Sequence, residues 1–247
     1  MFHITKPNIP DRKISRLFCA CDIDKEITEN LESLNITPVK LSGLDIFDTP
    51  VRNHPDMLCF HVGDNKWIFY KSVYDKNKRE IDELSLDIIL ADNPKSGKYP
   101  DNIALNAAYL DKYILCAEKH TDKLIFEHCE EEKTVLNIKQ GYAKCSVCIV
   151  DEKSVITSDM SIYKTCIQNG IDVLLIRCGY IDLCGYDYGF IGGCSGLIDK
   201  NMLAFTGDIT KHPDYDGIKE FCDSKNVEII SLSKKKLYDY GSLIPII

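Results

Sequence analysis

The sequence predicts an α/β fold made of repeated ββαβ units and closed by a strand at the C-terminus. Three observations support this prediction: two segments of the chain match each other without a gap, a hairpin pattern recurs, and a helical stretch follows each hairpin. A doubly wound parallel sheet is the alternative, because helices and strands alternate in it too. Hairpins between successive helices fit that alternative poorly, since parallel strands are joined by crossover connections.

The internal match aligns residues 144–159, KCSVCIVDEKSVITSD, with residues 193–208, GCSGLIDKNMLAFTGD. Five of the sixteen aligned positions are identical. Each segment has an apolar run, a polar turn with Asp and Lys, and a second apolar run, which is typical of a β-hairpin. Cys145 and Cys194 occupy equivalent positions, and we expect both on the first strand of their hairpins.

Two further hairpins with the same plan lie upstream, over residues 54–72 and 99–119. Each of the four hairpins is followed by a stretch with helical periodicity and then by a short β-branched strand. These four stretches cover residues 80–90, 121–139, 161–178 and 214–233. The ββαβ unit therefore recurs at intervals of about 40 to 49 residues, as in repeat architectures.

The N-terminal segment forms an incomplete fifth unit. It has a strand over residues 15–20, a helix that begins near the possible cap Asp24, and a strand over residues 37–42. One hairpin strand is missing. The last residues, 241–247, read GSLIPII, and pairing with the incomplete unit would satisfy their backbone groups. We therefore expect residues 1–247 to form a single domain.

Five ββαβ units closed by a terminal strand resemble the pentein superfamily, whose five-bladed β/α propeller is the fold of guanidine-modifying enzymes. The chain is most similar to an uncharacterised bacterial group within that superfamily. The resemblance implies that the first strand of each blade lines a central channel. It also implies the enzymes' chemistry: a cysteine nucleophile on the closing strand, a histidine on an earlier blade, and carboxylates that hold a guanidinium group.

The sequence departs from this enzyme pattern in two places. The closing strand has no cysteine, and the position of the nucleophile falls near Gly241 or Ser242. No histidine lies between His128 and His212, where the resemblance would place the second catalytic residue. Two classes of function stay open. One is a noncatalytic or divergent protein that binds a small ligand in the channel, and the other is a cysteine-dependent hydrolase or transferase acting on a guanidino or amide group.

Candidate site residues follow from this comparison. Cys194 is the candidate nucleophile, because Gly192 and Gly193 beside it would let backbone amides approach a ligand closely. His54 is the candidate general base that would activate the thiol, with Asp56 as a carboxylate that orients a cationic substrate. The candidate ligand-binding residues are Asp101, Asn102, Cys145, Gly192 and Gly193.

Structural interpretations compete with these assignments. Cys194 could be a buried thiol without chemistry, as free cysteines often are. The tripeptides at 54–56 and 99–101, HPD and YPD, begin two repeats, so their Pro and Asp residues could simply form the turn before a strand. His61 is a second histidine that could approach the channel. The loop over residues 178–189 could cover the channel mouth as a lid or pack as an ordinary surface loop.

Composition excludes several classes of function. With 38 acidic and 30 basic residues the net charge is −8, which repels nucleic acid. No apolar run has the length of a signal peptide or a membrane span, so we expect a cytoplasmic protein that does not bind membranes. The twelve cysteines are then free thiols in a reducing compartment.

The sequence indicates no cofactor and no metal. Glycine motifs for nucleotides are absent from strand-to-helix positions. Cys145 and Cys148 have the spacing of a metal-binding pair, but alternation along a strand would put them on opposite faces. The expected partner is a small cationic molecule, and the sequence does not identify a protein partner.

Overall fold

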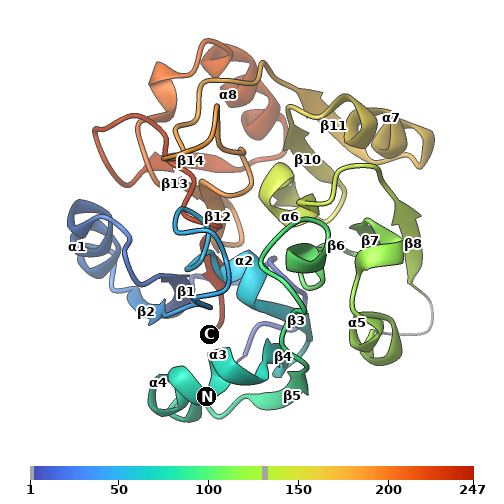
Figure 1. Cartoon of the computed structure of the whole chain (residues 1–247). Helices are drawn as coiled ribbons and strands as arrows, with labels where there is room; N and C mark the ends of the chain where they lie inside the picture. The colour runs from blue at the N-terminus through green and yellow to red at the C-terminus, as the bar shows by residue number, and fades with distance from the viewer. Residues whose placement is uncertain (1–2, 130–132) are drawn as a thin grey trace.

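The computed structural model of the protein describes residues 3–129 and 133–247. It has a mixed α/β fold with five separate three-stranded sheets, which lie around a common centre in Figure 1. Residues 130–132, within the expected third unit, lie outside the described part of the chain. The sheets are β1 (Arg16–Ala20), β2 (Thr37–Leu41) and β15 (Ile244–Pro245); β3 (Cys59–Gly63), β4 (Lys66–Tyr70) and β5 (Asp87–Ala91); β6 (Ala108–Leu110), β7 (Tyr113–Cys116) and β8 (Thr134–Asn137); β9 (Cys148–Asp151), β10 (Ser154–Thr157) and β11 (Asp172–Leu175); and β12 (Ser195–Asp199), β13 (Met202–Phe205) and β14 (Glu228–Ser231).

Four of the sheets have the same pairing pattern. The first two strands form an antiparallel hairpin, and the second strand pairs in parallel with the third. Helical segments connect the second strand to the third, as a parallel pair requires. The predicted ββαβ repeat is therefore confirmed.

The remaining sheet joins the two ends of the chain. β1 pairs in parallel with β2 and antiparallel with β15, with Leu17 opposite Pro245 and Phe18 opposite Ile244. Beyond the strand, Ile246 N–H donates to Arg16 O at 3.0 Å. The C-terminal strand thus supplies the hairpin strand that the N-terminal unit lacks, as the sequence predicted.

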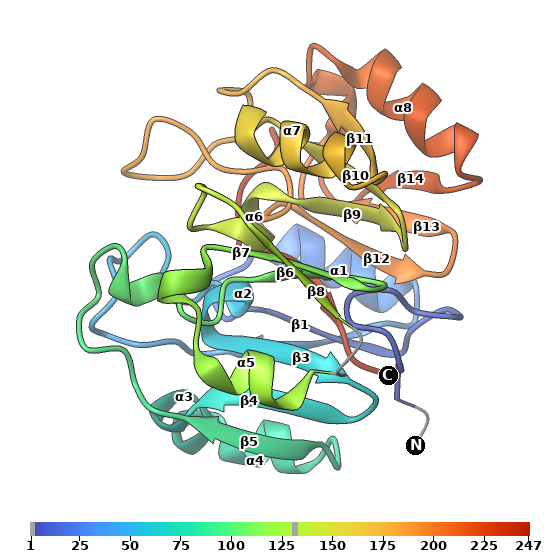
Figure 2. The same ribbon diagram turned by 90° about the vertical axis from the view of Figure 1, so that its right-hand side faces the viewer.

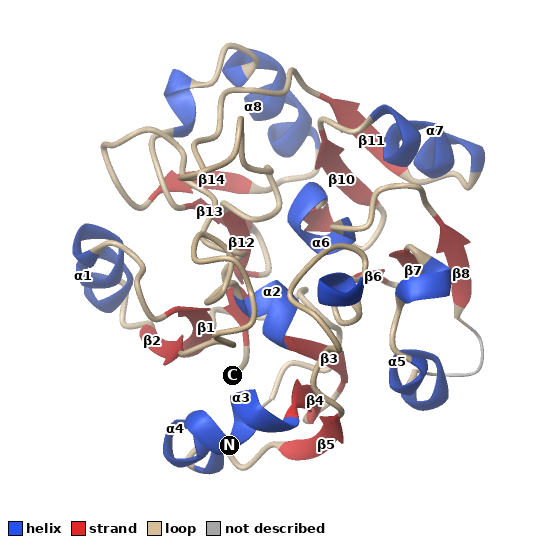
Figure 3. Cartoon of the chain, in the orientation of Figure 1, coloured by secondary structure: helices blue, strands red, loops and turns tan. Residues whose placement is uncertain are grey.

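The helices differ in length and place. The longer ones lie at the periphery, and the one-turn helices α2 and α6 lie near the middle (Figures 1 and 3). The helices are α1 (Lys25–Ser33), α2 (Pro55–Leu58), α3 (Lys71–Lys76), α4 (Lys78–Asp82), α5 (Lys123–His128), α6 (Ala143–Ser146), α7 (Met160–Gln168) and α8 (Tyr215–Ser224), with single 3₁₀ turns at η1 (Asp101–Ile103), η2 (Glu118–His120) and η3 (Ile209–Lys211).

One identity of the internal repeat has a helix-capping role. Asp159 accepts hydrogen bonds from Ser161 N–H and Ile162 N–H at the start of α7. The equivalent Asp208 accepts from Thr210 N–H at the start of η3. A side-chain acceptor before the first turn satisfies amide groups that have no partner in the helix. The repeated aspartate therefore marks where each hairpin ends.

Buried apolar residues hold neighbouring sheets together. Phe18 of the first sheet packs edge-to-face against Trp67 and Phe69 of the second, with ring centroids 5.2 and 5.6 Å apart. All three side chains are almost fully buried. Figure 2, turned by 90°, shows how the strands of successive units are stacked beside one another. This packing fixes the positions of the segments at the strand ends, which carry the side chains of the candidate site.

The structure corrects the expected position of the two repeated cysteines. Neither lies in a strand: Cys145 is in α6, and Cys194 is in a turn one residue before β12. In α6, Ser146 N–H donates to Tyr142 O at 3.0 Å, which closes a helical turn. The amides of Lys144 and Cys145 are drawn to Asn106 Oδ1, at 2.8 and 3.4 Å, so the backbone bends before the strand begins. Within the described residues, no helix combines the length and hydropathy needed to cross a membrane.

Candidate active site

A cluster of polar side chains forms where α2, α6 and the C-terminal segment meet. His54 occupies the N-cap position of α2, Asp56 lies in that helix, and Cys145 lies in α6. One ligand atom from each of these three residues lies within 4.8 Å of the others. All three residues are buried, with 3%, 1% and 2% of their surface exposed. The fold therefore brings together residues that are 89 positions apart in the chain.

Asp56 is the centre of this cluster. Its Oδ1 accepts a hydrogen bond from Cys145 Sγ at 3.1 Å. Asn106 Nδ2 donates to the same thiol at 3.1 Å and also lies 3.2 Å from Asp56 Oδ1. The other oxygen, Asp56 Oδ2, lies 2.6 Å from Ser242 Oγ. The carboxyl group is thus held from both sides, with one oxygen turned to the thiol.

Ser242 connects the cluster to a buried lysine. Lys144 Nζ donates to Ser242 Oγ at 3.0 Å, and the single hydroxyl proton of Ser242 goes to Asp56 or to Gly192 O, 2.9 Å away. Ser242 is fully buried and has a φ of 74°, which is unusual for a residue other than glycine. Such backbone geometry persists only where the surroundings enforce it, and here three polar partners do so.

Asp239 is the second buried carboxyl group of the site. Its Oδ1 lies 3.7 Å from His54 Nδ1, and the two oxygens accept from Gly241 N–H at 3.0 Å and Phe190 N–H at 2.9 Å. His54 Nδ1 is buried and has no hydrogen-bond partner. An unsatisfied buried nitrogen is costly, so His54 Nδ1 is open to a hydrogen bond with a ligand or a water molecule.

Burial dominates the protonation of these groups. It raises the pKa of Asp56, an effect that the neighbouring His54 and Lys144 partly oppose. It raises the pKa of Asp239 to about 6 and lowers the pKa of His54, so the imidazole is neutral at neutral pH. The pKa of the Cys145 thiol lies well above its usual value, because the thiol is buried and close to Asp56 and Asp239. Without a ligand the site therefore holds a protonated thiol.

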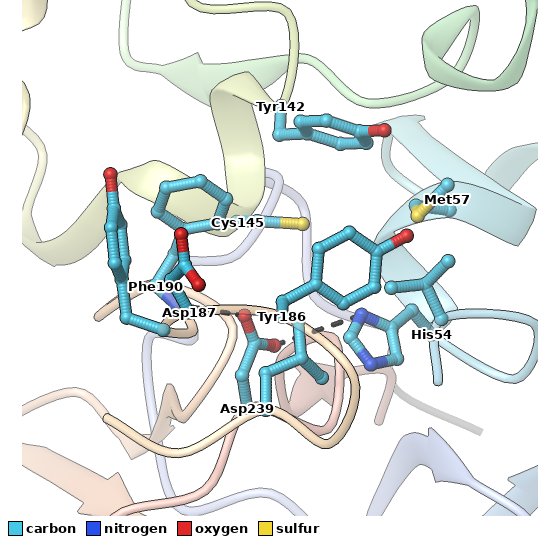
Figure 4. A pocket seen from close by; sticks show the side chains of 11 residues that line it. His54, Met57, Tyr142, Cys145, Tyr186, Asp187, Phe190 and Asp239 are labelled. Carbon is cyan, nitrogen blue, oxygen red and sulfur yellow. Dashed lines mark hydrogen bonds and ion pairs between the residues drawn. The ribbon is translucent and has the colours of Figure 1, made fainter. Parts of the chain in front are cut away.

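A cavity of about 240 Å³ opens onto this cluster (Figure 4). Aromatic and aliphatic side chains make up most of its wall, and Cys145, His54 and Asp239 contribute the reactive groups. Small-molecule sites usually have this character, an apolar enclosure with a few placed polar groups. The lining residues are Val51, His54, Met57, Tyr142, Cys145, Leu183, Tyr186, Asp187, Tyr188, Phe190 and Asp239.

The loop expected as a possible lid does line the cavity. Leu183, Tyr186 and Asp187 face it, and Tyr186 OH lies 3.2 Å from Asp48 Oδ2 on another loop. Tyr142 and Phe190 stack with ring centroids 6.3 Å apart, which continues the wall into α6. Residues 178–189, called the covering loop below, thus contribute to the cavity wall, and their role as a lid over a channel mouth stays a prediction.

Cys194, the expected nucleophile, lies apart from this cavity. It is fully buried in an apolar cluster, and its Sγ is 3.3 Å from Ile191 O. Burial raises its thiol pKa well above the usual value. The structure therefore brings His54 and Asp56 to Cys145, and leaves Cys194 among core residues.

The glycines beside Cys194 are occupied by the protein itself. A Cβ at Gly192 would lie 2.3 Å from Lys144 O, and one at Gly193 would lie 1.9 Å from Asp239 Oδ1. Gly193 N–H already donates to Cys145 O at 2.9 Å. These positions are glycine because α6 and Asp239 pack directly against the backbone, which places Asp239 beside the cavity.

The other expected residues are divided between the site and its surroundings. Asp101 is exposed in η1 and is not among the cavity residues. Asn102 is buried and donates from Nδ2 to Tyr142 OH at 3.0 Å, so it supports the cavity wall. His61 lies elsewhere, with Nε2 2.7 Å from Asp64 O and its ring stacked on Trp67.

Sequence reasoning missed four residues of the cluster: Asn106, Lys144, Asp239 and Ser242. For Ser242 a signal existed, since the superfamily comparison places a nucleophile near that position. Lys144 adjoins a candidate residue, but a lysine in a short polar segment predicts a solvated side chain, whereas this one is only 6% exposed. Nothing in the local sequence distinguishes Asp239 or Asn106 from surface residues.

The trio of His54, Asp56 and Cys145 also has the donor types of a metal site. Imidazole, carboxylate and thiolate together suit a thiophilic divalent cation such as Zn²⁺. Asn106 is hydrogen-bonded to Cys145 and Ser242 to Asp56. These two residues would therefore orient the ligands without binding the ion themselves. The residues could hold a metal, although the sequence predicted none.

Solved structures with the same fold are known. The chain is similar to inosamine-phosphate amidinotransferase from Streptomyces griseus, with 10% identity, coverage of 99% of this chain and 97% of the other, and a TM-score of 0.61. An amidinotransferase of the saxitoxin biosynthetic pathway from Microseira wollei has 9% identity, coverage of 93% and 91%, and a TM-score of 0.55. Agmatine deiminase from C. jejuni has 10% identity, coverage of 94% and 91%, and a TM-score of 0.54.

These structural similarities show the fold of the chain. It is the fold of the pentein superfamily, as the ββαβ repeats suggested. A search of curated protein sequences found no match. Within the superfamily fold, the chain belongs to the family of unknown function DUF6873, whose match spans residues 18–244.

Proposed function

We propose that this protein is a thiol-dependent enzyme of the pentein type that acts on a guanidino or amidino group, with Cys145 as its nucleophile. The observation that carries the proposal is the 3.1 Å contact between Cys145 Sγ and Asp56 Oδ1 at a cavity that His54 and Asp239 also line. The similar structures are enzymes named for amidino transfer and for agmatine deimination, and this supports the proposed substrate group.

The proposed reaction begins with binding of the cation. Asp239 accepts hydrogen bonds from the guanidinium group, whose positive charge lowers the pKa of the nearby thiol. Cys145 then gives its proton to Asp56. Because burial raises the pKa of Asp56, this carboxylate is a stronger base than an exposed aspartate.

The resulting thiolate attacks the central carbon of the substrate. One C–N bond breaks, and the departing nitrogen takes the proton from Asp56, with His54 Nδ1 as the neighbouring proton carrier. A covalent amidino–thioether at Cys145 is left. Attack by water would complete a hydrolase cycle, and attack by an amine would complete a transferase cycle. Either releases the Cys145 thiol.

We extend the proposal to the architecture: the five sheets are the blades of one closed β/α propeller over residues 1–247, and the cavity lies at one end of its channel. Pairing of β15 with β1 supports closure, because it joins the two chain ends in one sheet. The placement of α2 and α6 near the middle supports a central site (Figure 1).

The second candidate is a noncatalytic protein that binds a small cation in the same cavity. The raised pKa of the Cys145 thiol favours it, since a protonated thiol is a poor nucleophile. Both candidates share the cavity, and they differ in whether Cys145 forms a covalent bond.

Alkylation with 2-chloroacetamidine tests the shared site, and neutral chloroacetamide is the matched reagent. We expect the cationic reagent to modify Cys145 about tenfold faster or more, because carboxylates concentrate it at the thiol. Mass spectrometry locates the adduct, and Cys194→Ser serves as the control variant. Modification only at the exposed Cys178 and Cys184 would contradict the proposed site.

Release of ammonia or urea from guanidino compounds then separates the two candidates. The enzyme requires turnover that Cys145→Ser abolishes and Cys194→Ser preserves. Binding of the same compounds without any release, in the wild-type protein, would favour the noncatalytic candidate.

A further inference from the structure

The charge of the cavity wall limits what the rest of the ligand can be. Asp239 lies at the inner end, beside His54 and Cys145, and is 1% exposed. Asp187 is an exposed residue of the covering loop and lines the same cavity. Asp48, also exposed, is bonded to Tyr186 at the edge of this loop. Carboxyl groups therefore occur both at the reactive end and at the mouth.

Between these two ends the wall is apolar and aromatic. Met57, Val51 and Leu183 supply aliphatic surface, and Tyr142 and Phe190 supply stacked rings. The eleven lining residues include no lysine or arginine. The buried ammonium of Lys144 is bonded to Ser242 and is not among them.

The covering loop extends this aromatic surface outward. Tyr188 packs edge-to-face on Phe190, with centroids 6.0 Å apart, and Tyr186 is 43% exposed. Ring faces attract cations and apolar groups, whereas a carboxylate is favoured only at ring edges and at tyrosine hydroxyls, and the hydroxyl of Tyr186 is already bonded to Asp48. A carboxylate at the mouth would also face the exposed Asp187, and like charges at close range repel each other even where solvent weakens the interaction.

We infer that the ligand of this cavity is a small cation without a carboxylate, in which a guanidinium or amidinium group sits on an apolar stem and a second positive charge or an aromatic group lies at the mouth. This inference rests on the proposed function, and it adds the substrate class. A free amino acid is excluded as the preferred ligand, because its carboxylate would meet Asp187 with no compensating charge on the wall.

The size of the cavity agrees with this class. A volume of 240 Å³ corresponds to about eight water molecules at roughly 30 Å³ each. One guanidinium group with a short stem fits within such a space. The second positive charge would then lie at the opening, beside Asp187.

Binding to the Cys145→Ala protein, in which turnover is blocked, tests the inference by isothermal titration calorimetry. The probes are agmatine, L-arginine methyl ester and L-arginine. The first two carry two positive charges and no carboxylate, and arginine differs from its ester by the free carboxylate alone. We expect agmatine and the ester to bind about tenfold or more tightly than arginine, a difference that corresponds to about 1.4 kcal/mol.

The variant Asp187→Lys tests the assignment of the mouth residue. Because Asp187 is exposed, the substitution should leave the fold intact, which circular dichroism and the melting temperature check. We expect the preference for agmatine over arginine to fall by about tenfold or to reverse. Asp187→Asn, which removes the charge without inverting it, should give an intermediate ratio.

The outcomes separate this inference from the proposed function. Arginine that binds as tightly as agmatine, or more tightly, would overturn the substrate class and leave the guanidino site standing. An unchanged ratio in Asp187→Lys would overturn the role of the mouth carboxylate. Absence of binding by all three cations would overturn the proposed function together with the inference.

Discussion

Cys145 and Asp56 are in direct contact, with 3.1 Å between Sγ and Oδ1, although 89 residues separate them in the chain. The equivalent thiol of the sister repeat, Cys194, lies in an apolar cluster and donates a hydrogen bond to a backbone carbonyl, Ile191 O. Both thiols are buried, so burial does not distinguish them. The difference lies in the neighbours: Cys145 has an ionisable group to receive its proton and a cavity from which a ligand can approach it.

Replacing Asp56 should separate catalysis from binding. We expect Asp56→Asn to lower kcat by about 10²-fold or more, because the thiol loses its proton acceptor, and to change KM much less. Steady-state kinetics with a guanidino compound that the wild-type protein turns over measure both constants. Asp101→Asn is the matched control, since Asp101 is exposed in η1 and should have wild-type kinetics. Equal losses in the two variants would argue against a proton-accepting Asp56.

Affinity for a cation should depend on pH through Asp239. Burial raises the pKa of Asp239 to about 6, so the group is neutral below that pH and negative above it. Cation binding should therefore strengthen as pH rises through 6, by about tenfold per unit on the acid side. Titration calorimetry of Cys145→Ala with agmatine between pH 5 and pH 7.5 measures the effect.

Two variants identify the source of this pH dependence. His54 and Asp56 also face the site, so Asp239→Asn is needed, and it should flatten the profile near pH 6. Asp187→Asn should lower affinity without moving the midpoint. A midpoint that survives in Asp239→Asn would assign the titration to another group.

Protonated Asp239 also favours the folded state, so its contribution to the free energy of unfolding should fall as pH rises from about 4 to 6.

Ser242 should be important for stability through both its hydroxyl group and its backbone. Ser242→Ala removes a partner from buried Lys144 and from Asp56, at a cost of about 2 to 3 kcal/mol in the free energy of unfolding. Ser242→Gly makes the same deletion but relieves the strain of a φ of 74°. We expect the glycine variant to be more stable than the alanine variant by roughly 1 kcal/mol. Urea denaturation compares them, and an alanine variant as stable as glycine would contradict the strain.

The glycines next to Cys194 should be intolerant of any side chain. A Cβ at Gly192 would lie within 2.6 Å of three backbone carbonyl oxygens, which cannot move independently. We expect Gly192→Ala to lower the free energy of unfolding by about 3 kcal/mol or to prevent folding. Gly217→Ala in α8 is the control, because nothing lies within 4 Å of its Cβ, and it should be stabilising by about 0.5 to 1 kcal/mol. Similar melting temperatures for the two variants would refute this account of Gly192.

The sequence by itself determined the repeat and the pairing of the chain ends. Hairpins, caps and strand endings are local, so alternation of apolar residues and a capping residue such as Asp24 predict them directly. The partner of the last strand was also predictable, because the unit around Phe18 lacked one strand and Ile244 had no other partner. His54, Asp56 and Cys145 were all recognised as candidates on sequence grounds.

Only the tertiary structure decided which cysteine joins them. Cys145 and Cys194 have equivalent positions in equivalent repeats, so local sequence cannot tell which one faces a cavity. The glycines beside Cys194 suggested a ligand, but the space they leave is filled by α6 and Asp239. What a side chain contacts across the centre of the molecule depends on segments up to 186 residues away, as between Asp56 and Ser242. Such contacts follow from packing of whole units against one another, and no pattern within a single unit records them.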